Sequence, residues 1–381
     1  MLLFSDNVPV ADEVSLKEYA LRAGLLMLGP DCGTAILQGV PLGFANAVPR
    51  GGIGLVSASG TGLQQVTCLL AASGQGVSQA LGVGGRDMSD AVSGRMMLEC
   101  FRLLQEDEST EVVVLISKPP GRETTDRLMR VVRDTVKPCV LAFLGAQAEA
   151  HGPNVYVEPT LEAATSRVLN ITGDARIPGW ATVPPGVRSR LEDHLVGMSS
   201  GASQVRGFFS GGTLCYEALW LLQQDGLELH SNVALDGVLN LPDPDASRDH
   251  TLVDLGDDRY TSGRPHPMID FRPRCRRLLE EATDPTVGVV LMDVVLGYGS
   301  HPDPASELAT AIEEARGIAQ KAGGELACVL SLCGTDADPQ DIARQEERLN
   351  AAGAVVARSN ALAARITSAL TQRDLSGLPW G

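Results

Sequence analysis

The chain has 381 residues, of which 44% are hydrophobic, 4% are aromatic and 41 are glycine, and its formal net charge is −16. This length exceeds one typical hydrophobic core, and the Gly-rich, aromatic-poor composition favours parallel α/β sheets joined by tight turns over β-sandwiches. The negative field disfavours nucleic acids and anionic membranes as partners, although it leaves room for a local basic pocket.

The eight cysteines form no C-x-x-C pair and no Cys/His spacing typical of a metal site, so we expect reduced, mostly buried thiols and no bound metal. No apolar run approaches the roughly 18 residues of a membrane span. Residues 1–4 are not accompanied by the basic region of a signal peptide. We therefore expect a cytoplasmic protein.

Short apolar runs and longer amphipathic runs alternate along the chain, as expected for a repeated βα unit. A helix over 10–24 and a strand over 25–28 are too few for a domain, so residues 1–45 are predicted to be a fragment completed upstream or by a partner chain. A first lobe is predicted over 46–172, with strands at 53–57, 78–83, 112–117, 139–144 and 155–157.

Several Pro and Gly residues then interrupt any periodicity, and we interpret residues 173–203 as a linker. A second lobe is predicted over 204–375, with strands at 205–209, 251–255, 287–293, 326–332 and 354–357. The strands and their turns follow the same order as in the first lobe. The sequence therefore predicts an internal duplication, with two flavodoxin-like parallel-sheet lobes related by pseudo-symmetry.

Each lobe has a Gly-rich turn between its first strand and the following helix, where free backbone N–H groups and the helix dipole favour an anion. The predicted phosphate-binding residues are Ser59, Gly60, Thr61 and Gly62 in the first lobe and Ser210, Gly211, Gly212 and Thr213 in the second. Helix capping alone explains either turn taken singly. Recurrence at equivalent points favours a phosphate held between the two.

The densest polar segment, residues 254–270, follows a predicted core strand. One interpretation is a solvated loop with an internal Asp–Arg pair. In the other, Arg259 and Arg264 bind a carboxylate or phosphate and His266 transfers a proton, in a loop that its prolines stiffen.

Four further residues are predicted on the same rim of the sheets, namely Arg86, Asp87, Lys118 and His301. The other histidines are expected at the surface. A Walker-type phosphate loop is absent from the sequence, so nucleotide binding by that route has no support.

Five segments of the sequence resemble signatures of the FdrA-type proteins, relatives of succinyl-CoA synthetase, and these segments are residues 29–33, 56–62, 82–87, 117–120 and 254–270. The resemblance covers nearly the whole chain. It implies a first lobe similar to the ligase domain of the synthetase α-subunit and a second similar to the carboxy-terminal domain of the β-subunit. Residues 1–45 would then be the remnant of a Rossmann-like, CoA-binding-type domain.

The sequence departs from the synthetases at two motifs. Residues 144–152 lack the G-H-A-G-A loop of the phosphohistidine, and Lys118 begins a Lys-Pro-Pro run where the synthetases have G-E-I-G-G. No ATP-grasp domain is encoded, and CoA is expected to bind weakly or not at all. What the resemblance then implies is carbamoyl transfer between carbamoyl phosphate and oxamate in allantoin catabolism, without a firmly implied cofactor.

Two alternatives stay open from the sequence. One is a subunit of an ADP-forming acyl-CoA synthetase, and the other is a non-catalytic ligand-binding or scaffold subunit. In all three cases we expect companion enzyme subunits, and a homo-oligomer is compatible with the sequence.

Overall fold

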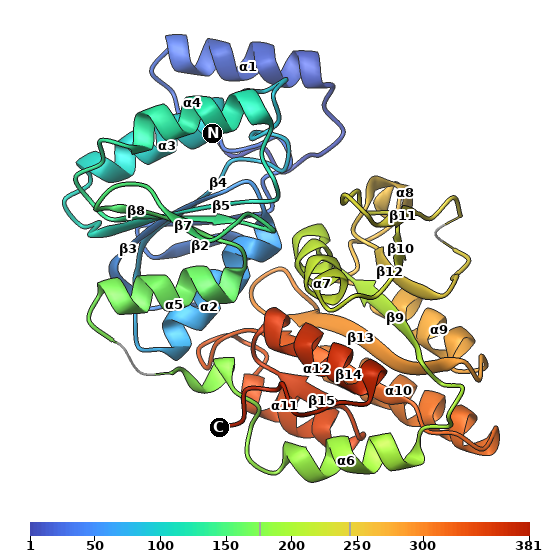
Figure 1. Ribbon diagram of the computed structural model, residues 1–381. Coiled ribbons are helices and arrows are strands. Elements are labelled where there is room, and N and C mark those ends of the chain that lie inside the picture. The colour runs from blue at the N-terminus through green and yellow to red at the C-terminus, as the bar shows by residue number, and fades with distance from the viewer. Residues whose placement is uncertain (175–176, 244) are drawn as a thin grey trace. The chain divides into compact units, whose positions relative to one another are not determined.

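The computed structural model describes residues 1–174, 177–243 and 245–381 of the chain (Figure 1). The chain divides into two compact units, the first comprising Met1–Arg176 with Gly297–Gly299 and the second Ile177–Leu296 with Ser300–Gly381. In each unit a largely parallel sheet is covered by helices on both faces (Figure 1). The predicted α/β class is thereby confirmed.

The first unit is built on a sheet in the order β2-β1-β4-β3-β5-β6-β8-β7. Its elements are α1 (Val10–Arg22), β1 (Thr34–Leu37), β2 (Val40–Gly43), β3 (Arg50–Ser57), α2 (Gly60–Ala72), β4 (Val77–Gly82), α3 (Arg95–Glu106), β5 (Val112–Ser117), α4 (Arg122–Val132), β6 (Cys139–Phe143), β7 (Glu149–Ala150), β8 (Val155–Glu158) and α5 (Leu161–Ile171). The parallel strands β4-β3-β5-β6-β8 have the flavodoxin-like order 2-1-3-4-5.

The second unit has the sheet order β11-β10-β12-β9-β13-β14-β15. Its elements are the 3₁₀ helix η1 (Gly179–Ala181), α6 (Val187–Gly197), β9 (Gln204–Phe209), α7 (Gly212–Gln224), β10 (Leu229–Ser231), β11 (Leu239–Asn240), β12 (His250–Asp254), α8 (Asp258–Thr261), α9 (Arg272–Glu281), β13 (Val287–Val295), α10 (Pro304–Lys321), β14 (Ala327–Cys333), α11 (Ile342–Ala351), β15 (Val355–Ala357) and α12 (Asn360–Gln372). The strands β12-β9-β13-β14-β15 repeat the order 2-1-3-4-5, which confirms the predicted pair of flavodoxin-like lobes.

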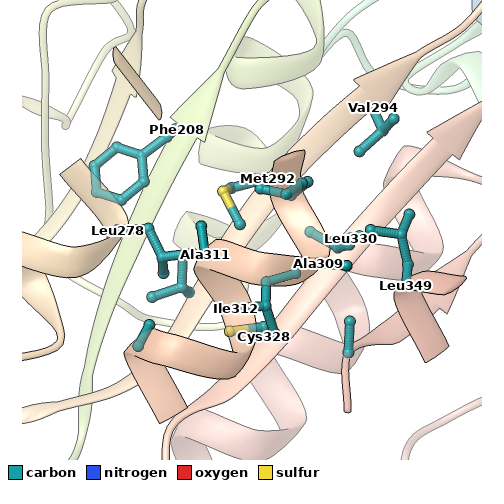
Figure 2. Packing of buried hydrophobic residues seen from close by; sticks show 14 of the residues in the cluster. Phe208, Leu278, Met292, Val294, Ala309, Ala311, Ile312, Cys328, Leu330 and Leu349 are labelled. Carbon is teal, nitrogen blue, oxygen red and sulfur yellow. The ribbon is translucent and has the colours of Figure 1, made fainter. Parts of the chain in front are cut away.

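The cores lie between the sheets and their covering helices. In the second unit, α9, α10 and α11 cover one face, and Figure 2 shows their side chains packed on β9, β13 and β14. Helices α7 and α12 pack together on the other face. All nine residues of β13 are buried, because a parallel strand covered on both faces is apolar almost throughout. In the first unit, α2 and α5 cover one face of the sheet, and α1, α3 and α4 the other (Figure 1).

The predicted N-terminal fragment 1–45 lies within the first unit. Strand β1 pairs with β4, and β2 pairs with β1, so residues 34–43 extend the first sheet. The strand predicted at 25–28 is wrong, because that segment contributes only an isolated bridge between Leu2 and Leu28.

The predicted irregular linker over 173–203 is also wrong in one part. Residues 187–197 form helix α6, on which Leu191 and His194 are buried. The prolines of this segment precede the helix, where the missing N–H costs no helical hydrogen bond. Residues 175 and 176 of the predicted linker lie outside the described residues. Among the helices that the structure describes, none combines the length and the apolarity needed to cross a membrane.

Candidate anion sites at the ends of β3 and β9

The first Gly-rich turn joins β3 to α2, and its serine caps the helix. Ser59 Oγ accepts a hydrogen bond from the Gly62 N–H at 2.9 Å. The Ser57 hydroxyl in turn donates to the Ser59 carbonyl oxygen at 2.7 Å. The first N–H groups of the helix, on Gly60 and Thr61, have no intrahelical acceptor. Gly60 is partly exposed, whereas Ser59 and Thr61 are buried.

The second turn joins β9 to α7 and is held differently. Gly211 is the N-cap residue, so no side chain caps this helix. The Ser210 N–H donates to Asp293 Oδ1 and the Ser210 hydroxyl donates to Asp293 Oδ2, both at 2.8 Å. Thr213 is buried, whereas Gly212 is partly exposed. This turn therefore leaves the donors of the first helical turn without a competing cap.

Asp293 belongs to a fully buried ion pair with Arg274. Arg274 Nη1 lies 2.9 Å from Asp293 Oδ1, and neither side chain is exposed to solvent. Arg274 Nη2 donates to the Pro267 carbonyl oxygen at 2.8 Å, and its guanidinium lies 4.0 Å from the centre of the Phe271 ring. Burial raises the pKa of Asp293 and lowers that of Arg274, and each charge opposes the effect of burial on the other.

The turn of the second unit lies where a flavodoxin-like sheet binds its ligand. Strands β9 and β13 are neighbours in the sheet and are strands 1 and 3 of the order 2-1-3-4-5. The chain leaves the sheet in opposite directions on the two sides of this point, which opens a crevice at the carboxyl ends of the strands. Ser210 follows β9 and Asp293 lies near the end of β13, so both residues belong to this edge.

Gly256 and His266 lie beside the same turn. A Cβ atom on Gly256 would lie 2.7 Å from the Ser210 carbonyl oxygen and 3.3 Å from His266 Nε2. Only glycine fits this close approach without a shift of its neighbours. His266 Nδ1 accepts a hydrogen bond from the Met268 N–H at 3.2 Å, so the neutral imidazole carries its proton on Nε2. The structure thus brings one predicted catalytic residue next to the second turn.

The two predicted arginines line a separate cavity of about 700 Å³ in the same unit. Five arginines line it, against three carboxylates, and these residues are Arg259, Arg264, Arg272, Arg276, Arg277, Asp245, Asp270 and Glu280. Pro265 and Pro267 also contribute to the wall, whereas His266 does not. The cavity therefore has an excess of positive charge in a strongly negative chain.

Most of these guanidinium groups are already held by carboxylates. Arg259 Nη2 lies 3.2 Å from Asp243 Oδ1 and 3.5 Å from Asp245 Oδ2, as in the solvated-loop interpretation. Arg272 forms two hydrogen bonds with Asp270, which lower the pKa of that carboxyl. The Arg264 guanidinium has no hydrogen bond or ion pair with any residue that the structure describes.

The remaining predicted rim residues are placed as follows. Arg86 Nε lies 3.1 Å from Glu13, and Asp87 is fully buried beside Lys17. Lys118 directly follows β5, within electrostatic reach of Asp31. His301 packs edge-on against Phe271 in the second unit, and its Nε2 lies 3.4 Å from Glu307. Both Arg86 and Asp87 are thus engaged by the first unit's own residues.

Sequence reasoning missed Arg274 and Asp293, the residues that hold the second turn. Asp293 gives a signal, because it is a carboxylate within an otherwise apolar run of nine residues. Arg274 gives none, since it is one of several arginines at the start of α9. Among the described residues, no group of three or more His, Cys, Asp and Glu side chains is arranged to hold a metal ion.

Comparison with known proteins adds relatives of several kinds. Residues 208–370 match the CoA-ligase family model. YahF of Escherichia coli is 41% identical over 368 residues, which cover 94% of this chain and 70% of YahF. The α-subunit of the ADP-forming succinate–CoA ligase of Methanothermobacter thermautotrophicus is 30% identical over 151 residues, which cover 39% of this chain and 50% of that subunit.

A solved structure resembles the whole chain only distantly. The dinucleotide-forming acetyl-coenzyme A synthetase 1 of Ca. Korarchaeum cryptofilum aligns with 98% of this chain and 77% of its own, at 14% identity and a TM-score of 0.34. A likeness of this degree carries no weight for the site.

Proposed function

The chain belongs to the FdrA-type proteins of the succinyl-CoA synthetase superfamily, and from this premise we propose that it is a transferase subunit acting on an acyl phosphate. The specific reaction that we propose is carbamoyl transfer between carbamoyl phosphate and oxamate, in allantoin breakdown. The observation that carries the proposal is the recurrence of a Ser-Gly turn after the first strand of each flavodoxin-like unit, at the start of α2 and of α7.

The phosphate of the acyl phosphate would bind at the start of α2 or at the start of α7, each turn being a site of its own unit. Backbone N–H groups provide donors without a positively charged side chain, and the helix dipole contributes about 0.3–2 kcal/mol per helix. Charge-assisted hydrogen bonds contribute about 1.5–3 kcal/mol each. Glycines at these turns let the anion approach the backbone, since no Cβ atom stands in the way.

The missing phosphohistidine motif also supports an acyl phosphate as the substrate. Residues 144–152 lack the histidine loop through which the synthetases transfer phosphate. Carbamoyl phosphate is already activated, so its transfer needs positioning and charge stabilisation rather than a phosphoenzyme. The oxamate nitrogen would attack the carbamoyl carbon, the C–O bond to phosphate would break, and phosphate would leave. The proton lost by the nitrogen would pass to the departing phosphate, because His266 Nε2 already carries a proton in the tautomer set by the contact of its Nδ1.

Arg264 is our candidate for holding the acceptor carboxylate. Its guanidinium lines the arginine-rich cavity and has no partner within the described part of the chain. A bidentate contact with a carboxylate would therefore compete with no internal ion pair. Arg259 is a weaker candidate, because Asp243 and Asp245 already contact it.

A ligase subunit is the second candidate function. The match to the CoA-ligase family model and the likeness to succinate–CoA ligase α-subunits favour an ADP-forming acyl-CoA ligase subunit. In that case a companion subunit would supply nucleotide binding. A non-catalytic scaffold is the third alternative, and companion subunits are expected in each case.

An assay of the chain together with the products of neighbouring genes separates the three. Release of phosphate from carbamoyl phosphate only when oxamate is present supports the transferase. Nucleotide turnover that requires CoA and is independent of carbamoyl phosphate supports the ligase. Inactivity in both assays, with every companion subunit present, would overturn both enzyme proposals.

A further inference from the structure

The buried pair of Arg274 and Asp293 connects the two parts of the proposed site in the second unit. On one side, Asp293 accepts both hydrogen bonds from Ser210, the first residue of the phosphate turn. On the other side, Arg274 donates to the carbonyl oxygen of Pro267, which forms part of the arginine-lined cavity. One ion pair therefore bridges the turn and the cavity wall.

This pair is costly for the fold. Both side chains are completely buried. Removing two charges from water costs free energy, and their mutual attraction often does not recover all of it. Arg274 Nε is buried and has no hydrogen-bond partner among the residues that the structure describes, which is uncommon in folded proteins. An apolar pair would fill the same space without these costs. Stability alone therefore does not account for the two residues.

The charges themselves suit an anion site. A lone carboxylate directly behind the turn would repel a phosphate bound at the start of α7, because charges interact strongly where water is excluded. Arg274 neutralises that carboxylate while leaving both of its oxygens available to Ser210. The arrangement orients the turn without presenting a negative charge to the ligand.

We infer that Arg274 and Asp293 are positioning residues that couple the phosphate turn at Ser210 to the wall of the arginine-lined cavity. The inference rests on the proposed function, since it assigns the turn and the cavity to donor and acceptor. The ordered turn presents its N–H groups to phosphate. The ordered Pro267 fixes the position of the cavity wall relative to the turn. Neither residue contacts the substrate itself.

The test compares two charge-neutralised pairs. In Asp293→Asn/Arg274→Met, the bridge loses its charges but keeps an amide oxygen for the Ser210 N–H. The matched control is Arg316→Met/Glu325→Gln, because Arg316 and Glu325 form a partly buried ion pair in this unit, at 2.7 Å, and neither is among the described residues that line the cavity or hold the turn. Phosphate affinity is measured by calorimetry, and amide hydrogen exchange is followed over residues 208–216 and 264–270.

We expect the bridge variant to keep its thermal stability and to bind phosphate at least tenfold more weakly, about the loss of one charge-assisted hydrogen bond. In the parent, phosphate should slow exchange in both segments. In the bridge variant, this protection should no longer reach residues 264–270. Turnover should show a higher KM for the acceptor with a smaller change in kcat, and Arg274→Lys should recover part of the loss.

Three results would overturn the inference: parental phosphate affinity in the bridge variant, an equal loss of affinity in the control, or phosphate protection that still reaches residues 264–270 in the bridge variant. Should the bridge variant fail to fold, Ser210→Ala removes only the hydroxyl contact with Asp293, and unchanged phosphate affinity there is equally decisive against it. A failure of the proposed function would give a different set of results from a failure of this inference. The parent would then show no phosphate binding or transfer, while faster exchange in both segments of the bridge variant would still establish the coupling.

Discussion

Lys17 Nζ lies 2.7 Å from Asp87 Oδ1, and neither side chain is exposed to solvent. Lys17 also contacts Glu13 at 2.8 Å, and Asp87 accepts hydrogen bonds from the N–H groups of Met96 and Met97 at the start of α3. Buried ion pairs, as well as apolar packing, therefore hold helix α1 against the rest of the first unit. A substrate role for Asp87 would require the loss of this network.

Lys17→Met is expected to destabilise the protein by about 3–5 kcal/mol, because it leaves the Asp87 carboxylate buried without its cation. Urea denaturation measures the loss. Glu18→Gln on the same helix is the matched control, since Glu18 is 45% exposed in its pair with Arg95 and should contribute less than about 1 kcal/mol. Similar losses in the two variants would contradict the structural role of Lys17.

Phosphate or sulfate is expected to raise the Tm of the parent protein, by linkage of anion binding to folding. At a phosphate concentration about 100-fold above Kd, the gain is about 2.7 kcal/mol. Gly60→Val and Gly211→Val should each abolish the part of this Tm increase that comes from anion binding at its own turn. At Gly60 the added Cβ lies 3.1 Å from Thr34 Oγ1, so a branched side chain also crowds that residue.

Gly317→Ala is the control for these variants, because a Cβ at Gly317 would meet no atom of the described part of the chain within 4 Å. It should respond to phosphate like the parent. If both valine variants also respond like the parent, the phosphate turns are wrongly assigned.

CoA is expected to bind weakly or not at all. The backbone N–H groups of Asp31 and Cys32 donate to the carbonyl oxygens of Ser5 and Leu3, so this loop is held by the protein itself. Isothermal calorimetry with CoA, with phosphate as the positive control, measures the affinity. A micromolar Kd for CoA would favour the acyl-CoA ligase subunit over the transferase.

Arg264→Lys is expected to lower kcat/KM for the acceptor by roughly 5- to 150-fold, equivalent to about 1–3 kcal/mol. Lysine keeps the charge but lacks the bidentate fork of arginine. Thermal unfolding should barely change, since the guanidinium has no partner among the described residues to lose. Arg248→Lys is the control, at a 75% exposed arginine that does not line the cavity. Unfolding of Arg264→Lys with unchanged activity per folded molecule would instead assign Arg264 to the structure.

The regular elements that sequence predicts best are the buried parallel strands. Strand β5 has the bounds that its apolar run predicts, because burial on both faces leaves little ambiguity about where the run ends. The hairpin of β1 and β2 was missed. Its turn places Gln38 and Gly39 at φ angles of 51° and 83°, which is typical of a type I′ turn, yet Gln-Gly is not the usual Asn-Gly signal.

Only part of the candidate site could be predicted from the sequence. The Gly-rich turns are local features, so their positions at the helix starts follow from the pattern of residues. The partner of Ser210 does not, since Asp293 is 83 positions away and meets it only through the pairing of β9 with β13. Arg264 and His266 are two residues apart but have different surroundings, since His266 lies near Gly256 and Arg264 lines the cavity.

The ends of the two sheets limit how the protein can associate with itself or with companion subunits. Both edges of each sheet are short strands, of four residues in β2, two in β7, two in β11 and three in β15, and β2 carries Pro41. Such edges expose few unpaired backbone groups, which protects against strand addition by another chain and against aggregation. Assembly is therefore expected to use helix surfaces and loops rather than a continuous intermolecular sheet.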